Sequence, residues 1–247
     1  MGLVHSFETF TTVDGPGIRF ILFLSNCPLR CKYCHNPDTW ACKGKEYSVD
    51  DIVNEILKYK NYYKNGGVTI SGGEPLLQID FVIEIFKKLK KYNMHTAIDT
   101  SGITFNENQI EKFDELNKYT DLYLLDIKEI DEKKHIILTG KSNKNILEFA
   151  QYLSKNNKKV WIRHVIVPTI NLDKDDLIKT REFIDTLNNV ERVDVLPYHT
   201  LGVHKYKELG LKYPLEGVRT PTSEEIKFAK EILGDKWWIL KVYVLLK

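Results

Sequence analysis

Short apolar runs alternate with longer amphipathic stretches along the whole chain. The apolar runs are rich in β-branched and aromatic residues, a pattern typical of buried β-strands. The pattern predicts six strands, at Arg19–Ser25, Val68–Ser71, His95–Asp99, Leu122–Ile127, Val160–Val167 and Arg192–Tyr198.

The amphipathic stretches begin with residues that commonly cap helices. Ser48 stands before VDDIVNEILKYKNYY, Asp80 before FVIEIFKKLKKY, and Ser142 before NKNILEFAQYLSK. The stretches DKDDLIKTREFIDTL and SEEIKFAKEIL follow the same pattern. Regular alternation of strands and helices predicts parallel strands joined by crossover helices, and hence an α/β sheet or barrel. No repeat or flexible linker divides the chain, so we expect a single domain over residues 1–247.

The composition is that of an ordinary globular protein, with 43% apolar and 28% charged residues among 247. The 36 basic and 34 acidic residues give a net charge of +2, which does not favour nucleic acid or an anionic membrane as a partner. The N-terminus lacks a secretory signal, and the segments FILFL and WWILKVYVLL are shorter than the roughly 20 residues of a membrane helix. We therefore expect a cytoplasmic monomer.

Three of the four cysteines lie in the segment CPLRCKYC, at Cys27, Cys31 and Cys34. In a reducing compartment, clustered thiols are more often metal ligands or redox groups than disulfides. A structural zinc needs a fourth ligand, which Cys42 or His35 would have to supply. A four-iron four-sulfur cluster on three cysteines fits the spacing better, and it leaves one iron open for an outside ligand.

Other unusual residues follow the carboxyl ends of the predicted strands, in SGGEP, DTSG, DIK, HVIVP and LPYHTLG. Loops at this edge of a parallel sheet converge on one ligand site. The two glycines of SGGEP permit close approach of a ligand, although they also suit a tight turn. Asp99 and Asp126 are compatible with helix caps, with ion pairs to Lys128 and Arg163, or with binding of a cation.

The stretch TVDGPGIRFILFLSNCPLRCKYCHN resembles the start of the radical S-adenosylmethionine (SAM) activases of glycyl radical enzymes. Similar motifs follow in the same order, in CHNPDTW, SGGEPLLQ, IDTSG, LLDIK, LEFAQYL, VWIRHVIVP and LPYHTLGVHKY. Many activases carry a ferredoxin-like insert with extra cysteines, and its absence favours the branch acting on pyruvate formate-lyase (formate acetyltransferase). The resemblance implies an α/β fold, a partial (β/α)6 barrel of the TIM-barrel type, with one 4Fe-4S cluster and SAM.

The resemblance also implies roles for individual residues. Cys27, Cys31 and Cys34 match the cluster ligands. The residues that match SAM contacts are Tyr33, Cys34, His35, Gly73, Asp126, Ile127, Lys128 and His199, with Arg163 as a further carboxylate partner. A monovalent cation site beside the SAM carboxylate is matched by Asp99, Thr100, Asp126 and the carbonyl of Leu124. Asn26 stands where the family usually has glycine, and asparagine tolerates the left-handed conformation better than most residues.

The activity that the resemblance implies is formation of a glycyl radical on a partner enzyme. The reduced cluster cleaves SAM, and the 5′-deoxyadenosyl radical removes the α-hydrogen of one partner glycine, releasing 5′-deoxyadenosine and methionine. Flavodoxin or ferredoxin is the implied electron donor. We hypothesise that TVDGPGIR and the loop Leu201–Lys212 recognise the partner peptide, through Asp14, Gly15, Arg19 and His204.

Two other interpretations remain open. The chain could be a radical SAM enzyme that acts on a small molecule or on a different glycyl radical enzyme, or it could be a structural zinc or interaction module. The N-terminal segment 1–16 and the apolar C-terminal tail 235–247 are both expected to pack on the core domain.

Overall fold

The computed structural model describes residues 1–234 and divides the chain into two compact units. The first unit comprises Met1–Pro28 and Thr39–Leu124, and the second comprises Leu29–Asp38 and the chain from Leu125 onward. Each unit is described below by itself. The single domain stays a prediction, and the predicted packing of the tail 235–247 lies outside the described residues.

The first unit is built on a sheet with the strand order β3-β1-β2-β4-β5-β6. β2, β4 and β5 run parallel to one another, whereas β1 is antiparallel to both β2 and β3. The strands are β1 (Gly2–Thr11), β2 (Arg19–Leu24), β3 (Lys45–Tyr47), β4 (Gly67–Gly72), β5 (His95–Thr100) and β6 (Leu122–Asp126), the last of which continues into the second unit. The parallel strands read as continuous apolar runs because both of their faces are buried, as the adjacent residues Phe20 and Ile21 in β2 illustrate.

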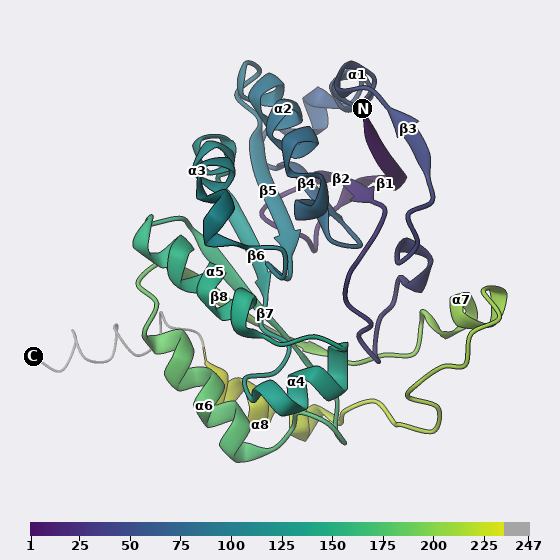
Figure 1. The fold of residues 1–247 in the computed structure, drawn as a ribbon, viewed down its shortest axis with the longest axis vertical. Coiled ribbons are helices and arrows are strands. Elements are labelled where there is room, and N and C mark those ends of the chain that lie inside the picture. Colours follow the sequence, from purple (N-terminus) through teal and green to yellow (C-terminus); the bar gives the residue numbers. More distant parts are fainter. Residues whose placement is uncertain (235–247) are drawn as a thin grey trace, which may run out of the picture. The chain divides into compact units, whose positions relative to one another are not determined.

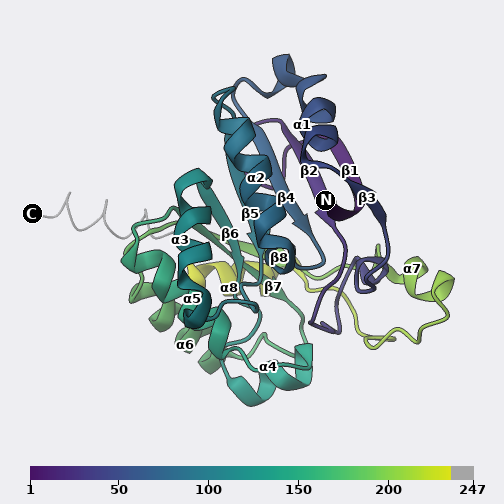
Figure 2. The same ribbon diagram turned by 45° about the horizontal axis from the view of Figure 1, so that its top comes forward.

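Three helices, α1 (Val49–Leu57), α2 (Ile79–Lys90) and α3 (Ile110–Tyr119), lie in a row over this sheet (Figures 1 and 2). The predicted cap at Ser48 is confirmed, because its hydroxyl accepts the Asp51 N–H at 3.1 Å while the Asp51 carboxylate accepts the Ser48 N–H. Single 3₁₀ turns occur at Pro37–Thr39, Lys60–Tyr63, Pro75–Gln78 and Glu107–Gln109.

The second unit contains the parallel pair β7 (Val160–Ile166) and β8 (Val190–Pro197). Its helices are α4 (Glu132–Thr139), α5 (Lys144–Lys155), α6 (Lys174–Asp185), α7 (Val203–Glu208) and α8 (Ser223–Leu233). α6 and α8 pack together, and α8 also packs on β8 (Figure 1). The buried side chains that join β7, β8, α6 and α8 are Ile166, Val195, Leu177, Ala229 and Leu233.

All six predicted strands and the five predicted helices are present. The pattern missed β1, β3, α3, α4 and α7. β1 alternates buried and half-exposed positions only at its start, alternates exposed and half-exposed positions from Ser6 on, and carries many polar residues. The apolar residues of α4 are not confined to one side of the helix. No helix among the described residues is long and apolar enough to cross a membrane.

Candidate functional site

In the first unit, the SGGE loop lies against the segment that leads into Cys27. The Gly73 N–H donates to the Leu24 carbonyl and the Glu74 N–H donates to the Asn26 carbonyl, both at 2.8 Å. A Cβ atom on Gly73 would lie 2.2 Å from the Asn26 oxygen and 3.0 Å from the Cys27 Cβ. Only glycine fits here, so the predicted SAM contact Gly73 is also what lets this loop approach the first cysteine.

Asn26, where the family usually has glycine, adopts the left-handed conformation with φ at 79°. The backbone path into the cysteine loop therefore requires this conformation, and asparagine supplies it at a modest cost. Asn26 also donates its N–H to the Thr39 carbonyl at 2.8 Å, which ties both ends of the loop together within the first unit.

Glu74 links the SGGE loop to the DTSG loop that follows β5, a role the sequence analysis did not assign. Its side chain is fully buried, and its carboxylate accepts hydrogen bonds from the Thr100 hydroxyl and from both the N–H and the hydroxyl of Ser101. The Leu76 N–H also donates to it, at 3.2 Å. Burial raises the pKa of Glu74, while the donors from Ser101 and Thr100 oppose that rise.

The predicted cation ligands of the first unit lie at the same strand ends. The Asp99 carboxylate accepts the Ser71 hydroxyl at 2.8 Å, which joins the ends of β4 and β5. Thr100 is buried and donates its hydroxyl to Glu74, and Leu124 is fully buried in β6. Oxygen atoms suited to a hard cation are therefore present in this unit, and the cation itself stays a prediction.

The TVDGPG loop lies at the other edge of the first unit's sheet. Arg19 is the first residue of β2, so about 20 Å of strand separates it from the cysteine segment that follows Leu24. The Thr69 hydroxyl donates to the Asp14 carbonyl at 2.7 Å, and Gly15 has a positive φ of 118°. The predicted peptide contacts Asp14 and Gly15 are therefore held together at the amino end of β2.

Arg19 itself is fully buried. Its guanidinium donates to Thr69 Oγ1 at 2.6 Å, and to the carbonyls of Pro16 and Val68 at 3.0 and 2.7 Å. Burial lowers its pKa to about 10, and the charges of Asp121 and Asp14 oppose this effect, so it is still cationic at neutral pH. In this structure the buried Arg19 guanidinium joins the TVDGPG loop to β4 by hydrogen bonds. A direct contact with a partner peptide would require the guanidinium to leave these acceptors.

In the second unit, the loop with Cys31 and Cys34 is fastened to α4. The N–H groups of Arg30 and Lys32 donate to the carbonyls of Thr139 and Leu138, at 2.8 and 3.0 Å. The Cys34 N–H donates to the Cys31 carbonyl at 3.0 Å, forming a tight turn. Burial raises the pKa of Cys31 to about 12, with Lys128 opposing that rise, so in the ligand-free chain Cys31 is a thiol that must lose its proton to bind iron.

Lys128, Asp126 and Tyr33 form a buried polar group beside this loop. The Lys128 ammonium donates to the Asp126 carboxylate at 2.7 Å and lies 5.8 Å from the centre of the Tyr33 ring. Burial is the largest single effect and lowers the pKa of Lys128, but Asp126, Tyr33 and Cys31 together outweigh it, so the pKa of Lys128 is raised well above its usual value. The Tyr33 hydroxyl is buried with no hydrogen-bond partner among the described residues, which marks a position where a ligand would supply one.

Ile127, between the two charged residues, is held by its backbone. Its N–H donates to the Arg163 carbonyl at 3.0 Å, and its own carbonyl accepts the His164 Nδ1–H at 2.6 Å. Buried Asn171 donates to the carbonyls of Lys128 and Val165, at 3.3 and 2.7 Å. The structure therefore brings the backbone of Arg163 alongside the DIK segment, while the role of Arg163 as a carboxylate partner stays a prediction, and it adds His164 and Asn171 as supports that the sequence analysis missed.

His35 and His199 stack face to face, with ring centres 3.8 Å apart and planes 16° from parallel. His35 Nε2–H donates to the His199 carbonyl at 3.0 Å, and a Cβ on Gly202 would lie 2.6 Å from the His35 oxygen. Burial lowers the pKa of His35, and the neighbouring His199 lowers it further. The structure therefore brings these two predicted SAM contacts directly together.

α7 contacts the loop that contains Cys34. Lys205 pairs with Asp38 at 3.0 Å and donates to Asn36 at 2.9 Å, and the Tyr206 hydroxyl donates to the Cys34 carbonyl at 3.1 Å. His204, predicted to contact the partner, is exposed, and its Nδ1–H donates to the Leu201 carbonyl at 2.9 Å. Lys205 and Tyr206 lie within the motif LPYHTLGVHKY, which was the only sequence signal for them.

The cysteines fit a metal cluster in their chemistry. None of the four cysteines forms a disulfide in the described part of the chain, and Cys42 is exposed while Cys27 and Cys31 are buried. Within residues 1–234, no three His, Cys, Asp or Glu side chains lie together as a ready ion site. Cys27 belongs to the first unit, and Cys31 and Cys34 belong to the second, so the three-cysteine ligand set rests on spacing and on the resemblance.

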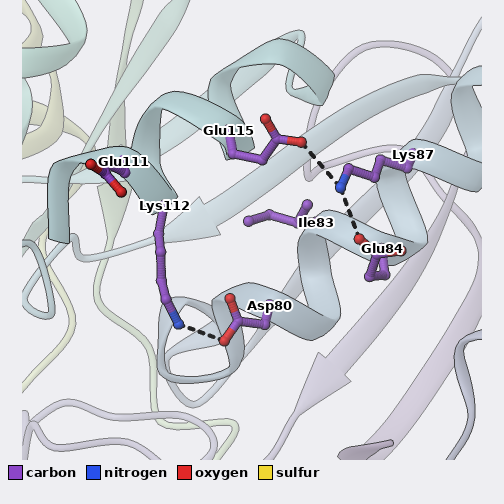
Figure 3. Close-up of a pocket in the computed structure, with 7 residues that line it drawn as sticks. All are labelled: Asp80, Ile83, Glu84, Lys87, Glu111, Lys112 and Glu115. Carbon is purple, nitrogen blue, oxygen red and sulfur yellow. Dashed lines mark hydrogen bonds and ion pairs between the residues drawn. The ribbon is translucent and has the colours of Figure 1, made fainter.

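A pocket of about 250 Å³ lies between α2 and α3 in the first unit (Figure 3). Its charges are paired internally: Lys87 contacts Glu84 and Glu115 at 2.9 and 3.1 Å, and Lys112 contacts Asp80 at 2.6 Å. Such ion pairs on exposed helices are ordinary solvated surface.

Comparison with known proteins places these features in context. The chain matches the Radical SAM superfamily over residues 21–184. It is 54% identical over 238 residues to the pyruvate formate-lyase-activating enzyme of Listeria monocytogenes, covering 94% of this chain and 96% of that protein. It is 56% identical over 234 residues to the protein of that name from Staphylococcus epidermidis, with coverage of 92% and 93%.

Solved structures agree with this similarity. A domain of the pyruvate-formate lyase-activating enzyme from Bacteroides vulgatus matches with a TM-score of 0.57 and 27% identity, covering 68% of this chain and 93% of that domain. SuiB of Streptococcus suis, bound to its precursor peptide SuiA, matches with a TM-score of 0.61 and 21% identity, covering 78% and 41% of the two chains. At that identity the second match shows the fold alone.

Proposed function

Because the chain belongs to the radical SAM superfamily, and within it to the family of pyruvate formate-lyase-activating enzymes, we propose that it generates the glycyl radical of pyruvate formate-lyase. The observation that carries this proposal is an identity above 50% that runs over more than nine-tenths of both chains. The predicted α/β fold class, that of the partial (β/α)6 barrels of radical SAM enzymes, is confirmed. The chain is therefore an oxidoreductase that uses a 4Fe-4S cluster and SAM.

When bound, the cluster and SAM supply a 5′-deoxyadenosyl radical that takes the α-hydrogen of a partner glycine. The chain's own residues bind and orient these groups. Cys27, Cys31 and Cys34 would hold the cluster, and the burial of Cys27 and Cys31 would limit access of water. Gly73 leaves room for the backbone of its loop to approach a ligand next to Cys27.

The second unit supplies charge and shape for SAM. Lys128 stays protonated, so it offers a positive charge to a carboxylate, and Asp126 offers a negative charge to an ammonium or sulfonium group. The Tyr33 hydroxyl offers a buried donor that lacks a partner among the described residues. The stacked pair His35 and His199 offers flat aromatic surface suited to a nucleoside base.

Several finer points belong to this proposal. A monovalent cation would bind Asp99, Thr100, Asp126 and the Leu124 carbonyl, and the oxygen atoms found at the ends of β4 and β5 support it. A flavodoxin or ferredoxin would supply the electron. Asp14 and Gly15, in the loop that Arg19 holds, and His204 on α7 would contact the partner peptide. The free cysteines support a reducing, cytoplasmic setting, and we propose a monomer of one domain.

The test is anaerobic reconstitution with iron and sulfide, followed by electron paramagnetic resonance of pyruvate formate-lyase after incubation with SAM and a reductant. We expect a glycyl radical signal and release of 5′-deoxyadenosine, with neither when SAM is omitted. About one zinc per chain with no sulfide would instead establish a structural zinc module. Cleavage of SAM with a radical only on a different glycyl radical enzyme would reassign the partner and keep the chemistry.

A further inference from the structure

α4 has one buried face and one exposed face. His135, Leu138 and Thr139 are buried, as expected for positions three and four residues apart on a helix. Lys133, Ile136 and Ile137 lie on the opposite face, where Ile136 is 45% exposed and Ile137 is 66% exposed. These two adjacent isoleucines form an apolar surface on an eight-residue helix, and the described residues of the second unit leave this surface exposed.

This surface adjoins the predicted cluster loop. Hydrogen bonds from the N–H groups of Arg30 and Lys32 join the loop to the last turn of α4, and these two residues stand on either side of Cys31. Cys31 is itself 7% exposed. Because Leu138 and Thr139 are buried, a protein seated on the exposed face of α4 would be separated from this loop by the width of one helix, roughly 10 Å.

The rim of this surface is basic. Arg30, Lys133 and Lys141 are exposed and Lys32 is half-exposed, whereas Lys134 turns aside to pair with Asp176. Glu132 is the acidic residue of the helix, and its carboxylate accepts the Ser142 hydroxyl. We define the α4 patch by these members: Arg30, Lys32, Lys133, Ile136, Ile137 and Lys141.

We propose that the α4 patch is the docking surface for the electron carrier, a small acidic redox protein. This inference rests on the proposed function, since a reductively cleaved cofactor requires one electron from outside. One electron leaves the carrier, which is oxidised by one electron, and enters the cluster, which is reduced by one; no bond forms or breaks between the proteins. An apolar centre with a basic rim suits a small transient interface that is steered by charge.

The test uses the full chain with its cluster reconstituted, and an acidic flavodoxin as the probe. Binding of oxidised flavodoxin is measured anaerobically by biolayer interferometry at low and high salt, for Lys133→Glu and Ile137→Ser. The matched controls are Lys227→Glu and Phe228→Ser, an adjacent exposed basic and apolar pair on α8, where Phe228 is 37% exposed. Reduction of the cluster by reduced flavodoxin and by dithionite is followed in parallel.

Lys133→Glu should slow association roughly 10-fold at low salt and much less at high salt, because charge steering is screened. Ile137→Ser should raise the dissociation rate several-fold at both salt concentrations. Both controls should match the unmodified chain, and dithionite should drive SAM cleavage equally in all variants. The proposal is wrong if flavodoxin binds both α4 variants as it binds the unmodified chain. It is also wrong if these variants bind flavodoxin normally but bind pyruvate formate-lyase more weakly. Failure of SAM cleavage with dithionite in the unmodified chain would instead count against the proposed function.

Discussion

Glu74 in the first unit and Tyr33 in the second are both buried polar side chains next to segments that carry predicted cluster ligands, yet their hydrogen bonding differs. The Glu74 carboxylate receives four hydrogen bonds from the two neighbouring strand-end loops. The Tyr33 hydroxyl has none among the described residues, and it shares its surroundings with the charged pair Lys128 and Asp126. The first region is complete without a ligand, whereas the second has polar groups that a ligand would satisfy.

This difference assigns separate tasks to the two regions. Loops that are fixed by their own hydrogen bonds can hold a backbone such as that of Gly73 in one place before any ligand arrives. Buried groups that lack partners cost stability in the empty protein and regain it when a ligand binds. Changes in the first region should therefore affect folding most, and changes in the second should affect ligand binding most.

The largest effect is expected at the cysteine segment CPLRCKYC. Cys31→Ala should abolish cluster assembly, because three thiolates are the minimum that holds the cluster with one iron open. Iron and sulfide content after anaerobic reconstitution measures this directly. Cys42→Ala is the matched control, since Cys42 is exposed and lies outside the CPLRCKYC spacing. Equal loss of metal in both variants would favour a site with four cysteine ligands.

The next largest effect is expected in the first region, where Glu74 is fully hydrogen-bonded without a ligand. Glu74→Ala leaves the Thr100 and Ser101 donors buried without an acceptor, and should lower the free energy of unfolding of the cluster-free chain by about 3 kcal/mol. Glu74→Gln keeps one acceptor oxygen and should lose less. Urea unfolding followed by circular dichroism measures both, with exposed Glu111→Ala as the control. A loss in Glu74→Ala no larger than in the control would mean that this network does not stabilise the fold.

The sequence predicted the core strands well because their apolar runs are long and buried on both faces, and it predicted the strand-end site because motifs marked each loop. It missed α4 because Ile136 and Ile137 point outward while His135 and Thr139 point inward, so the hydrophobic period of a helix is absent. It also placed Arg19 as a partner contact, although only tertiary structure shows that the Thr69 and Val68 acceptors bury it. Hydrogen-bond partners distant in sequence, such as Glu74 and Ser101, leave no local pattern.

A smaller effect on folding, with a larger effect on binding, is expected in the second region. Lys128→Met should weaken SAM binding roughly 10- to 100-fold, because the carboxylate of SAM loses the positive charge that we propose it binds. The free energy of unfolding of the empty chain should fall by about 1–2 kcal/mol, less than in Glu74→Ala, because Asp126 loses its ion-pair partner but is 26% exposed and can be solvated by water. Equilibrium dialysis with SAM and urea unfolding measure the two quantities.

The control for that variant is Lys134→Met, which removes the Lys134–Asp176 pair from the same unit. It should leave SAM affinity unchanged. If Lys128→Met destabilised the empty chain as much as Glu74→Ala while binding SAM normally, the contrast between the two regions would be reversed.

The smallest effect concerns pH and the stacked histidines of the second region. Burial, together with the neighbouring His199, lowers the pKa of His35 below its usual value of 6.5, and burial also lowers those of His135 and His164. Below pH 6.5 the unfolded chain therefore binds more protons at these sites than the folded chain does, until the pH reaches the lowered values. Their contribution to stability is present above pH 6.5 and is lost as the pH falls through that window.

Replacing His35 should therefore make the stability of the empty chain less sensitive to acid. His35→Phe keeps an aromatic ring against His199, and His35→Gln keeps an N–H donor for the His199 carbonyl, but neither side chain titrates. Urea-unfolding midpoints at pH 7.5 and 5.5 measure the difference for each variant and for the unmodified chain. Both variants should lose less stability on acidification, because one of the three histidines with a lowered pKa no longer takes up a proton on unfolding. If both variants lose as much stability between pH 7.5 and 5.5 as the unmodified chain, His35 is protonated equally in the folded and unfolded chains. The stacking of His35 on His199 would then not disfavour the protonated form of His35.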